Sequence, residues 1–207
     1  MNSQFKRLQD VAGPVSRETF DRLAVFQTEF ERWASRMNLA APSTLADIWE
    51  RHILDSAQLY RLAPDALSWL DLGSGGGFPG AVLAILLRDR RGAKIDLVES
   101  NARKAAFLRT LLAKLEAPAA VHAQRVEVVR LADPQVITAR ALAPLPLLLE
   151  LSERWLQADA RGLFHKGRGY RAEVAESRHC WRFDLLEHRS ALAESVILEI
   201  ANLRRNV

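Results

Sequence analysis

A glycine-rich turn between a short apolar strand and a helix restricts the fold of this chain more than any other feature. The segment from Asp71 to Gly80 reads Asp-Leu-Gly-Ser-Gly-Gly-Gly-Phe-Pro-Gly. Residues 68–72 before it predict a strand, and residues 79–87 predict a helix with Pro79 in its first turn. Glycines permit positive φ and a close approach of a ligand to the backbone. A strand, glycine turn and helix in this order are typical of nucleotide-binding α/β folds.

The chain beyond residue 66 alternates between short strands and helices. A helix capped by Asn101 and a helix over 145–156 separate further apolar segments. These segments predict strands at 95–98, 119–123, 136–139 and 162–165, and a closing pair at 183–188 and 196–201. The alternation predicts an α/β, Rossmann-like fold: a mostly parallel sheet with helices on both faces. Ligands bind such sheets beyond the carboxyl ends of the strands.

A helical extension precedes this alternating part. Apolar residues recur at spacings of three and four over residues 16–39, which predicts a helix with Ser16 as its N-cap. A second helix is expected over residues 45–62, with Pro42-Ser43-Thr44 as the break between the two. The spacing predicts core-facing stripes for both helices.

The 207-residue length fits one domain with an extension, divided as residues 1–65 and 66–207 of one compact unit. The first part carries 8 basic and 9 acidic residues, and the second carries 21 and 16. The basic surplus therefore lies in the later part, where six Lys and Arg fall between Arg161 and Arg182. Arginine binds phosphate and stacks on bases, so this distribution favours an RNA partner.

Targeting signals are not expected. The longest apolar run, Ala81 to Leu87, is far shorter than a membrane helix, and the first residues lack the apolar region of a secretory signal. Cys180 is the single cysteine, so no internal disulfide forms. We expect a cytoplasmic protein that does not associate with membranes. The histidines lack the clustered spacing of metal ligands, so no metal site is expected.

Two nucleotide ligands compete for the glycine turn. Gly75-x-Gly77-x-x-Gly80 matches a dinucleotide fingerprint, which favours NAD. Asp71, two residues before Gly73, would repel a pyrophosphate there. It suits the ammonium and sulfonium groups of S-adenosylmethionine instead. The pattern therefore favours a methyltransferase over an NAD-dependent dehydrogenase.

Charged residues follow the other predicted strands. Glu99 ends the second strand, where a carboxylate accepts hydrogen bonds from ribose hydroxyls. The Gln124–Glu127 loop is placed to meet the adenine ring. Arg140 and the pair Lys166 and Arg168 end later strands and are candidates for phosphate contact.

The chain resembles the ribosomal RNA small subunit methyltransferase G family, also called glucose-inhibited division protein B. Matching segments are Asn38-Leu39, Arg51-His52-Ile53-Leu54-Asp55-Ser56, Asp71 to Gly80, Arg125-Val126-Glu127, Thr138-x-Arg140-Ala141 and Lys166-Gly167. Ala40 departs from the family's frequent Thr. The resemblance implies S-adenosylmethionine-dependent methylation of N7 of one guanine in small-subunit ribosomal RNA. It places cofactor contacts at Gly73, Phe78, Val126, Glu127 and Arg140, beside Asp71, Gly75 and Glu99 from the motif.

The implied chemistry needs no general base, because guanine N7 has a free lone pair and no proton to lose. No catalytic residue is therefore assigned, and positioning is expected to carry the rate. His52 and Asp55 lie on one predicted helix face and are candidates either for RNA contact or for docking the extension. The target base must be unstacked or flipped out.

Other functions remain open at the level of sequence. An NAD-dependent oxidoreductase explains the glycines and Glu99 but not Asp71 or the arginine-rich later segment. A non-enzymatic ribosome-binding factor on the same fold is a second alternative, and methylation of a small molecule is a third. The favoured partner is small-subunit ribosomal RNA or a ribosomal particle, bound by a monomer.

Overall fold

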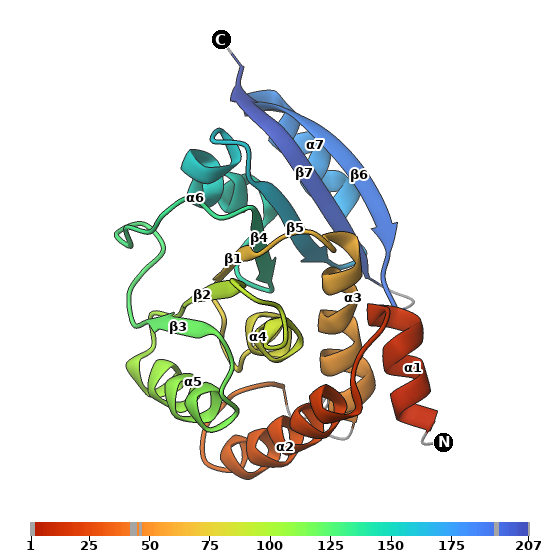
Figure 1. Cartoon of the computed structure of the whole chain (residues 1–207). Helices are drawn as coiled ribbons and strands as arrows, with labels where there is room; N and C mark the ends of the chain where they lie inside the picture. The colour runs from red at the N-terminus through yellow and green to blue at the C-terminus, as the bar shows by residue number, and fades with distance from the viewer. Residues whose placement is uncertain (1–2, 42–44, 46, 193–194, 207) are drawn as a thin grey trace.

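A seven-stranded sheet forms the centre of the computed structural model, which describes residues 3–41, 45, 47–192 and 195–206. The strand order is β3-β2-β1-β4-β5-β7-β6 (Figure 1). The first five strands in this order are parallel, and β7 is antiparallel to both neighbours. The strands are β1 (Ser68–Leu72), β2 (Lys94–Val98), β3 (Ala119–His122), β4 (Val136–Arg140), β5 (Arg161–Lys166), β6 (Trp181–Arg189) and β7 (Val196–Arg205). The order reverses between β1 and β4, where such sheets open a ligand crevice.

Helices cover both faces of the sheet (Figure 1). They are α1 (Ser3–Ala12), α2 (Arg17–Ala34), the π-helix η2 (Trp49–Leu54), α3 (Asp55–Leu62), α4 (Gly80–Leu87), α5 (Ala102–Lys114), α6 (Leu145–Leu156) and α7 (Tyr170–Cys180). The helices up to α5 pack on one face, and α6 and α7 pack on the other. The fold class predicted from the alternation is confirmed.

Alternation along the strands divides the buried side chains between the two faces. In β1, Trp69 belongs to the cluster under α4, and Leu70 belongs to the cluster under α6. Leu163 and Phe164 divide in the same way in β5. Successive side chains of a strand point to opposite faces, so a strand covered on both sides is apolar at consecutive positions.

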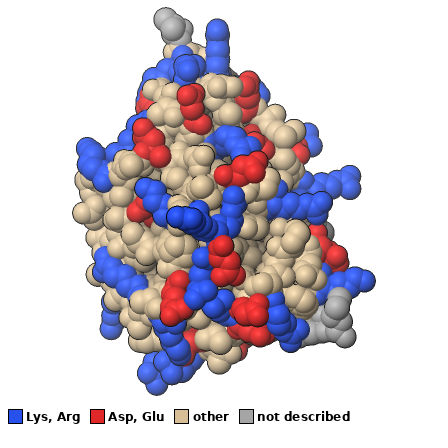
Figure 2. All heavy atoms as spheres, viewed as in Figure 1, with Lys and Arg blue, Asp and Glu red and all other residues tan. Residues whose placement is uncertain are grey.

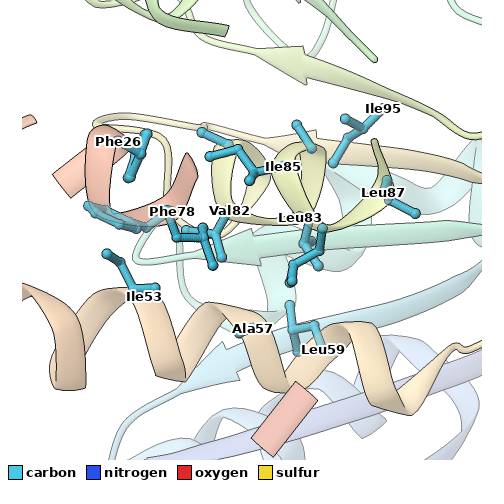
Figure 3. Close-up of a cluster of buried hydrophobic side chains, with 14 of the residues drawn as sticks. Phe26, Ile53, Ala57, Leu59, Phe78, Val82, Leu83, Ile85, Leu87 and Ile95 are labelled. Atoms are coloured by element: carbon cyan, nitrogen blue, oxygen red, sulfur yellow. The ribbon is translucent and has the colours of Figure 1, made fainter. Parts of the chain in front are cut away.

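The N-terminal extension shares a hydrophobic core with the sheet. Figure 3 shows Ile53 of η2 and Ala57 of α3 on the side of their helix that faces Val82 and Leu83 of α4. All four side chains are fully buried. The extension is therefore packed onto α4, the helix that follows the glycine turn, and its position affects the loop that begins that helix.

Local signals in the sequence agree with the structure at several boundaries. The Ser16 side chain accepts a hydrogen bond from the Thr19 amide, and the Asn101 side chain caps α5 as predicted. The first predicted helix ends at Ala34, earlier than expected. The second consists of η2 followed by α3, and the break at 42–44 lies outside the described residues.

Two helices were not predicted. Helix α1 carries Phe5, Leu8 and Ala12 at helical spacing, so its sequence does contain the apolar periodicity of a helix. In α7 only Ser177 is buried, so this helix has no apolar stripe that periodicity would reveal. Within the described residues, no helix is long and apolar enough to cross a membrane.

Candidate active site

A cavity of about 1140 Å³ opens at the carboxyl ends of β1, β2, β4 and β5. Asp71 and Arg168 do not line it. The predicted site residues that do are His52, Asp55, Gly73, Gly75, Phe78, Glu99, Val126, Glu127, Arg140 and Lys166. The structure thus brings together residues from both halves of the chain around one hollow.

Asp71 anchors the glycine turn from behind. Its carboxylate is fully buried and accepts hydrogen bonds from the Thr138 hydroxyl at 2.7 Å and from the Gly80 amide at 3.2 Å. Burial raises the pKa of Asp71 to about 6, although hydrogen bonds from Ser74, Thr138 and Gly80 oppose the rise. The carboxylate therefore joins β1, β4 and the start of α4.

This arrangement differs from the expected contact between Asp71 and an ammonium group. The carboxylate oxygens are turned toward protein donors, and Asp71 contributes no surface to the cavity. The approach to Gly80 is so close that a Cβ there would lie 2.5 Å from Asp71 Oδ2. Asp71 thus acts on the cavity through the shape of the loop.

Glu99 ties the glycine turn to the loop after β2. One carboxylate oxygen accepts from the Gly75 amide at 2.8 Å, and the other accepts from the Asn101 amide at 2.6 Å. The side chain lines the cavity although the residue is only 8% exposed. Each oxygen keeps lone pairs for further donors, because a carboxylate has about four acceptor positions.

Gly75 leaves the backbone of the turn open to the cavity. Its φ is +55°, and a Cβ there would meet no atom closer than 3.8 Å. Gly73 also has positive φ, but a Cβ there would lie 2.5 Å from Leu142 Cδ1. Gly73 is therefore required by the packing of the loop after β4, whereas Gly75 leaves room for a ligand.

The segment after β3 forms a third edge of the cavity. Val126 is buried and lines it, and Glu127 lines it while pairing with Arg125 at 2.9 Å. The pairing with Arg125 lowers the pKa of Glu127. This edge offers an apolar side chain and a carboxylate side by side.

Arg140 forms the opposite side together with the extension. Its guanidinium donates to His52 Nδ1 at 2.7 Å and to Asp55 Oδ2 at 3.4 Å. It also lies 5.1 Å from the centre of the Phe78 ring, on which His52 stacks at 4.8 Å. Arg140 thus connects β4 to η2 and α3, beside the glycine turn.

Burial and the contact with Arg140 together set the protonation state of His52. Burial, with the positive charge of Arg140, lowers the pKa of His52 to about 4. The ring is therefore neutral near pH 7, and because arginine only donates, Nδ1 must be the acceptor. The proton resides on Nε2, which is buried and has no partner among the described residues.

Asp55 is the hub of a buried network that sequence reasoning did not reveal. Its carboxylate accepts from Ser190 Oγ at 2.7 Å and Gln58 Nε2 at 2.8 Å. His165 Nε2 donates to the Asp55 backbone carbonyl at 3.0 Å. Ser190 and His165 are 135 and 110 residues away along the chain, so no local spacing connects them to Asp55.

Lys166, predicted to contact phosphate, is bound inside the protein. Its ammonium group donates to the Ala143 carbonyl at 2.7 Å and to Glu173 Oε2 at 2.8 Å. The same Glu173 oxygen accepts from the Leu145 amide at the start of α6. Lys166 therefore holds α6 and α7 against β5, and Arg168 lies exposed in the following loop. The described residues hold no group of three or more potential metal ligands.

Comparison with known proteins identifies the family. The profile of GidB, rRNA small subunit methyltransferase G, matches residues 20–196. The chain belongs to this family. Ribosomal RNA small subunit methyltransferase G of Chelativorans sp. (strain BNC1) is 61% identical over 99% of both chains. The protein of the same name from Brucella canis is 56% identical over 98% of this chain and 96% of that one. Membership of the methyltransferase G family decides against the NAD-dependent oxidoreductase.

Solved structures agree on the fold. Magnesium protoporphyrin IX methyltransferase from Synechocystis PCC 6803, with bound S-adenosylmethionine, superposes with a TM-score of 0.59 at 11% identity. The superposition covers 91% of this chain and 99% of that one. A variant of MtNAS in complex with S-adenosylmethionine gives a TM-score of 0.54 at 16% identity. That superposition covers 96% of this chain and 71% of the other. The methyltransferase G chain thus has the fold of S-adenosylmethionine-dependent enzymes.

Proposed function

We propose that this methyltransferase G chain transfers a methyl group from S-adenosylmethionine to N7 of a guanine in small-subunit ribosomal RNA. The observation that carries the proposal is the family match over residues 20–196, which includes both sides of the cavity. The substrate class and the guanine N7 specificity follow from the family.

The residues around the cavity fit an adenosine-containing cofactor. Glu99 retains acceptor positions for two ribose hydroxyls, and Gly75 exposes backbone without a side chain. Val126 offers an apolar contact beside the carboxylate of Glu127, as the adenine ring and its amino group require. We assign these residues to the cofactor, with Asp71 holding the loop that carries Gly75.

The chemistry then rests on position. S-adenosylmethionine supplies an electrophilic methyl group when bound. Guanine N7 needs no proton removed, so the protein has only to orient the base and exclude water. The target base becomes cationic as its N7 is methylated. Because Asp55 offsets the charge of Arg140 and His52 is neutral, these three side chains together present little net positive charge to it.

Cellular location and oligomeric state are part of the proposed function. A ribosomal substrate implies action in the cytoplasm, and we expect a monomer that acts on free ribosomal RNA or an assembled particle. Sedimentation of the purified protein and fractionation of cells test these two points.

Ligand binding and transfer test the proposal together. Titration with S-adenosylmethionine and with NADH, followed by calorimetry, should show binding of the first alone. The protein with labelled S-adenosylmethionine should then label small-subunit ribosomal RNA or particles that lack the modification. Binding of NADH alone, or label in neither substrate despite cofactor binding, would overturn the proposal.

A further inference from the structure

The cations predicted to contact RNA phosphates are largely used inside the protein. Arg140 is held by His52 and Asp55, and Lys166 is held by Glu173 and the Ala143 carbonyl. A ribosomal RNA substrate still requires cations that face solvent, because phosphate contacts provide most of the sequence-independent affinity. Figure 2 shows Lys and Arg interspersed with Asp and Glu over one face, so charge density there does not single out a surface. It is more informative to ask whether each Lys or Arg is already bound by an acceptor within the protein.

A groove between α2 and α5 carries two such cations. It has a volume of about 330 Å³. It is lined by Trp33 in the last turn of α2, by Arg36 and Met37 just after that helix, and by Arg103, Phe107 and their neighbours in α5. Arg36 and Arg103 are exposed. Within the described parts of the chain, neither guanidinium makes an ion pair or a side-chain hydrogen bond. By contrast, the nearby Lys114 and Arg32 both pair with Glu29.

An aromatic ring accompanies these two charges. Trp33 packs on Phe107 with the ring centres 5.7 Å apart, and it is only partly buried. The other four tryptophans are 0–4% exposed. An arginine pair beside an accessible indole is suited to single-stranded nucleic acid, since guanidinium groups bind phosphate and the indole stacks on any base.

The groove and the cavity are lined by residues that are neighbours along the chain. Lys104, next to Arg103, lines the cavity, and so does Leu39, two residues after Met37. Arg51 lines the cavity as well. A strand with its target base in the cavity therefore reaches the groove through nucleotides close to that base.

We propose that the α2–α5 groove binds the RNA strand next to the methylated guanine, with Arg36 and Arg103 on phosphates and Trp33 stacked on a base. This inference rests on the proposed function for its substrate class. It locates the RNA on the seam between the N-terminal extension and the sheet, and it gives the extension a role in holding substrate.

Salt dependence of RNA binding tests the two arginines. The double variant Arg36→Gln with Arg103→Gln is compared with wild type for binding of purified small-subunit ribosomal RNA over a range of KCl concentrations. Losing two phosphate contacts on a single strand reduces the slope of log affinity against log salt by about 1.4. The control variant, Arg91→Gln with Arg182→Gln, removes the same net charge from exposed arginines outside the groove and the cavity. Its slope should equal that of wild type.

Tryptophan fluorescence tests the stacking separately. Ribosomal RNA should quench part of the wild-type emission, and Trp33→Phe should remove that quenching, because the remaining tryptophans are buried. An unchanged salt slope in the groove variant, an equal change in the control variant, or quenching that persists in Trp33→Phe would overturn the proposed surface. Methyl transfer by the wild-type protein distinguishes this outcome from failure of the proposed function. If wild type methylates ribosomal RNA and the groove variant binds RNA as wild type does, only the proposed groove is disproved.

Discussion

On one side of the cavity, Asp71 and Glu99 hold the glycine turn through backbone amides. On the other side, Asp55 and Arg140 join side chains from segments more than 80 residues apart. We call these the loop wall and the ion-pair wall. The loop wall is specified by Asp71 near the end of β1 and by Glu99 directly after β2. The ion-pair wall exists only when the extension, β4, β5 and the turn after β6 have come together.

Each wall is therefore sensitive to a different kind of substitution. A change in the loop wall alters backbone shape and should act first on cofactor binding. A change in the ion-pair wall leaves a buried charge without its partner, so it should act first on stability. Substitutions in each wall distinguish these two effects.

Arg140→Met should lower the free energy of unfolding by about 3–5 kcal/mol, because it leaves the buried Asp55 carboxylate without a cation. Chemical denaturation measures the loss. Arg205→Met serves as control, since it breaks an exposed pair with Glu153 and should cost at most about 1 kcal/mol. Equal losses in the two variants would show that the ion-pair wall is no more than a surface contact.

Gly80→Ala should weaken the loop wall. The new methyl group would lie 2.5 Å from Asp71 Oδ2, so the carboxylate and the turn must shift, at a cost of about 1–3 kcal/mol. Calorimetry should show a larger loss of S-adenosylmethionine affinity than Arg140→Met produces under conditions where both variants are folded. Gly169→Ala is the control, because nothing lies within 4 Å of its new Cβ. Unchanged cofactor binding in Gly80→Ala would contradict the role assigned to Asp71.

Ser190→Ala tests whether the ion-pair wall extends to the turn after β6. The hydroxyl donates to Asp55 Oδ1 at 2.7 Å and accepts from the Leu192 amide. Its removal should cost about 1–2 kcal/mol of unfolding free energy. Ser35→Ala, which removes an exposed hydrogen bond to the Arg32 carbonyl, should cost less. A double-mutant cycle with Asp55→Asn should show coupling, and additive effects would separate Ser190 from the wall.

His52→Gln tests the ion-pair wall through the pH dependence of stability. The pKa of His52 is about 4 in the folded protein, so between that value and its ordinary value near 6.5 the unfolded chain binds more protons. This group therefore reduces wild-type stability as pH falls through that window. The stability difference between wild type and His52→Gln should shift in favour of the variant between about pH 7 and pH 5. Parallel curves for the two proteins would show that His52 is not held neutral.

The two walls also differ in what the sequence reveals. Strand β1 and the glycines after it are contiguous in the chain, and Glu99 follows the next predicted strand. Local patterning therefore identifies the loop wall and the fold. Patterning does not show which way a side chain at a strand end turns, and Asp71 faces Thr138 and Gly80 rather than the cavity. His165 and Ser190 have no local signature, because their partners lie in α3. Lys166 was placed correctly along the chain, but its binding to Glu173 depends on how α7 packs.

Nucleoside analysis determines whether this cavity directs a methyl group to guanine N7. Small-subunit ribosomal RNA that lacks the modification is incubated with the protein and labelled S-adenosylmethionine, as free RNA and as particles, and is then digested to nucleosides. The account predicts label in 7-methylguanosine with wild type and a strong loss of label with Gly80→Ala. Label in a different nucleoside, or none in either substrate from a protein that binds S-adenosylmethionine, would contradict it.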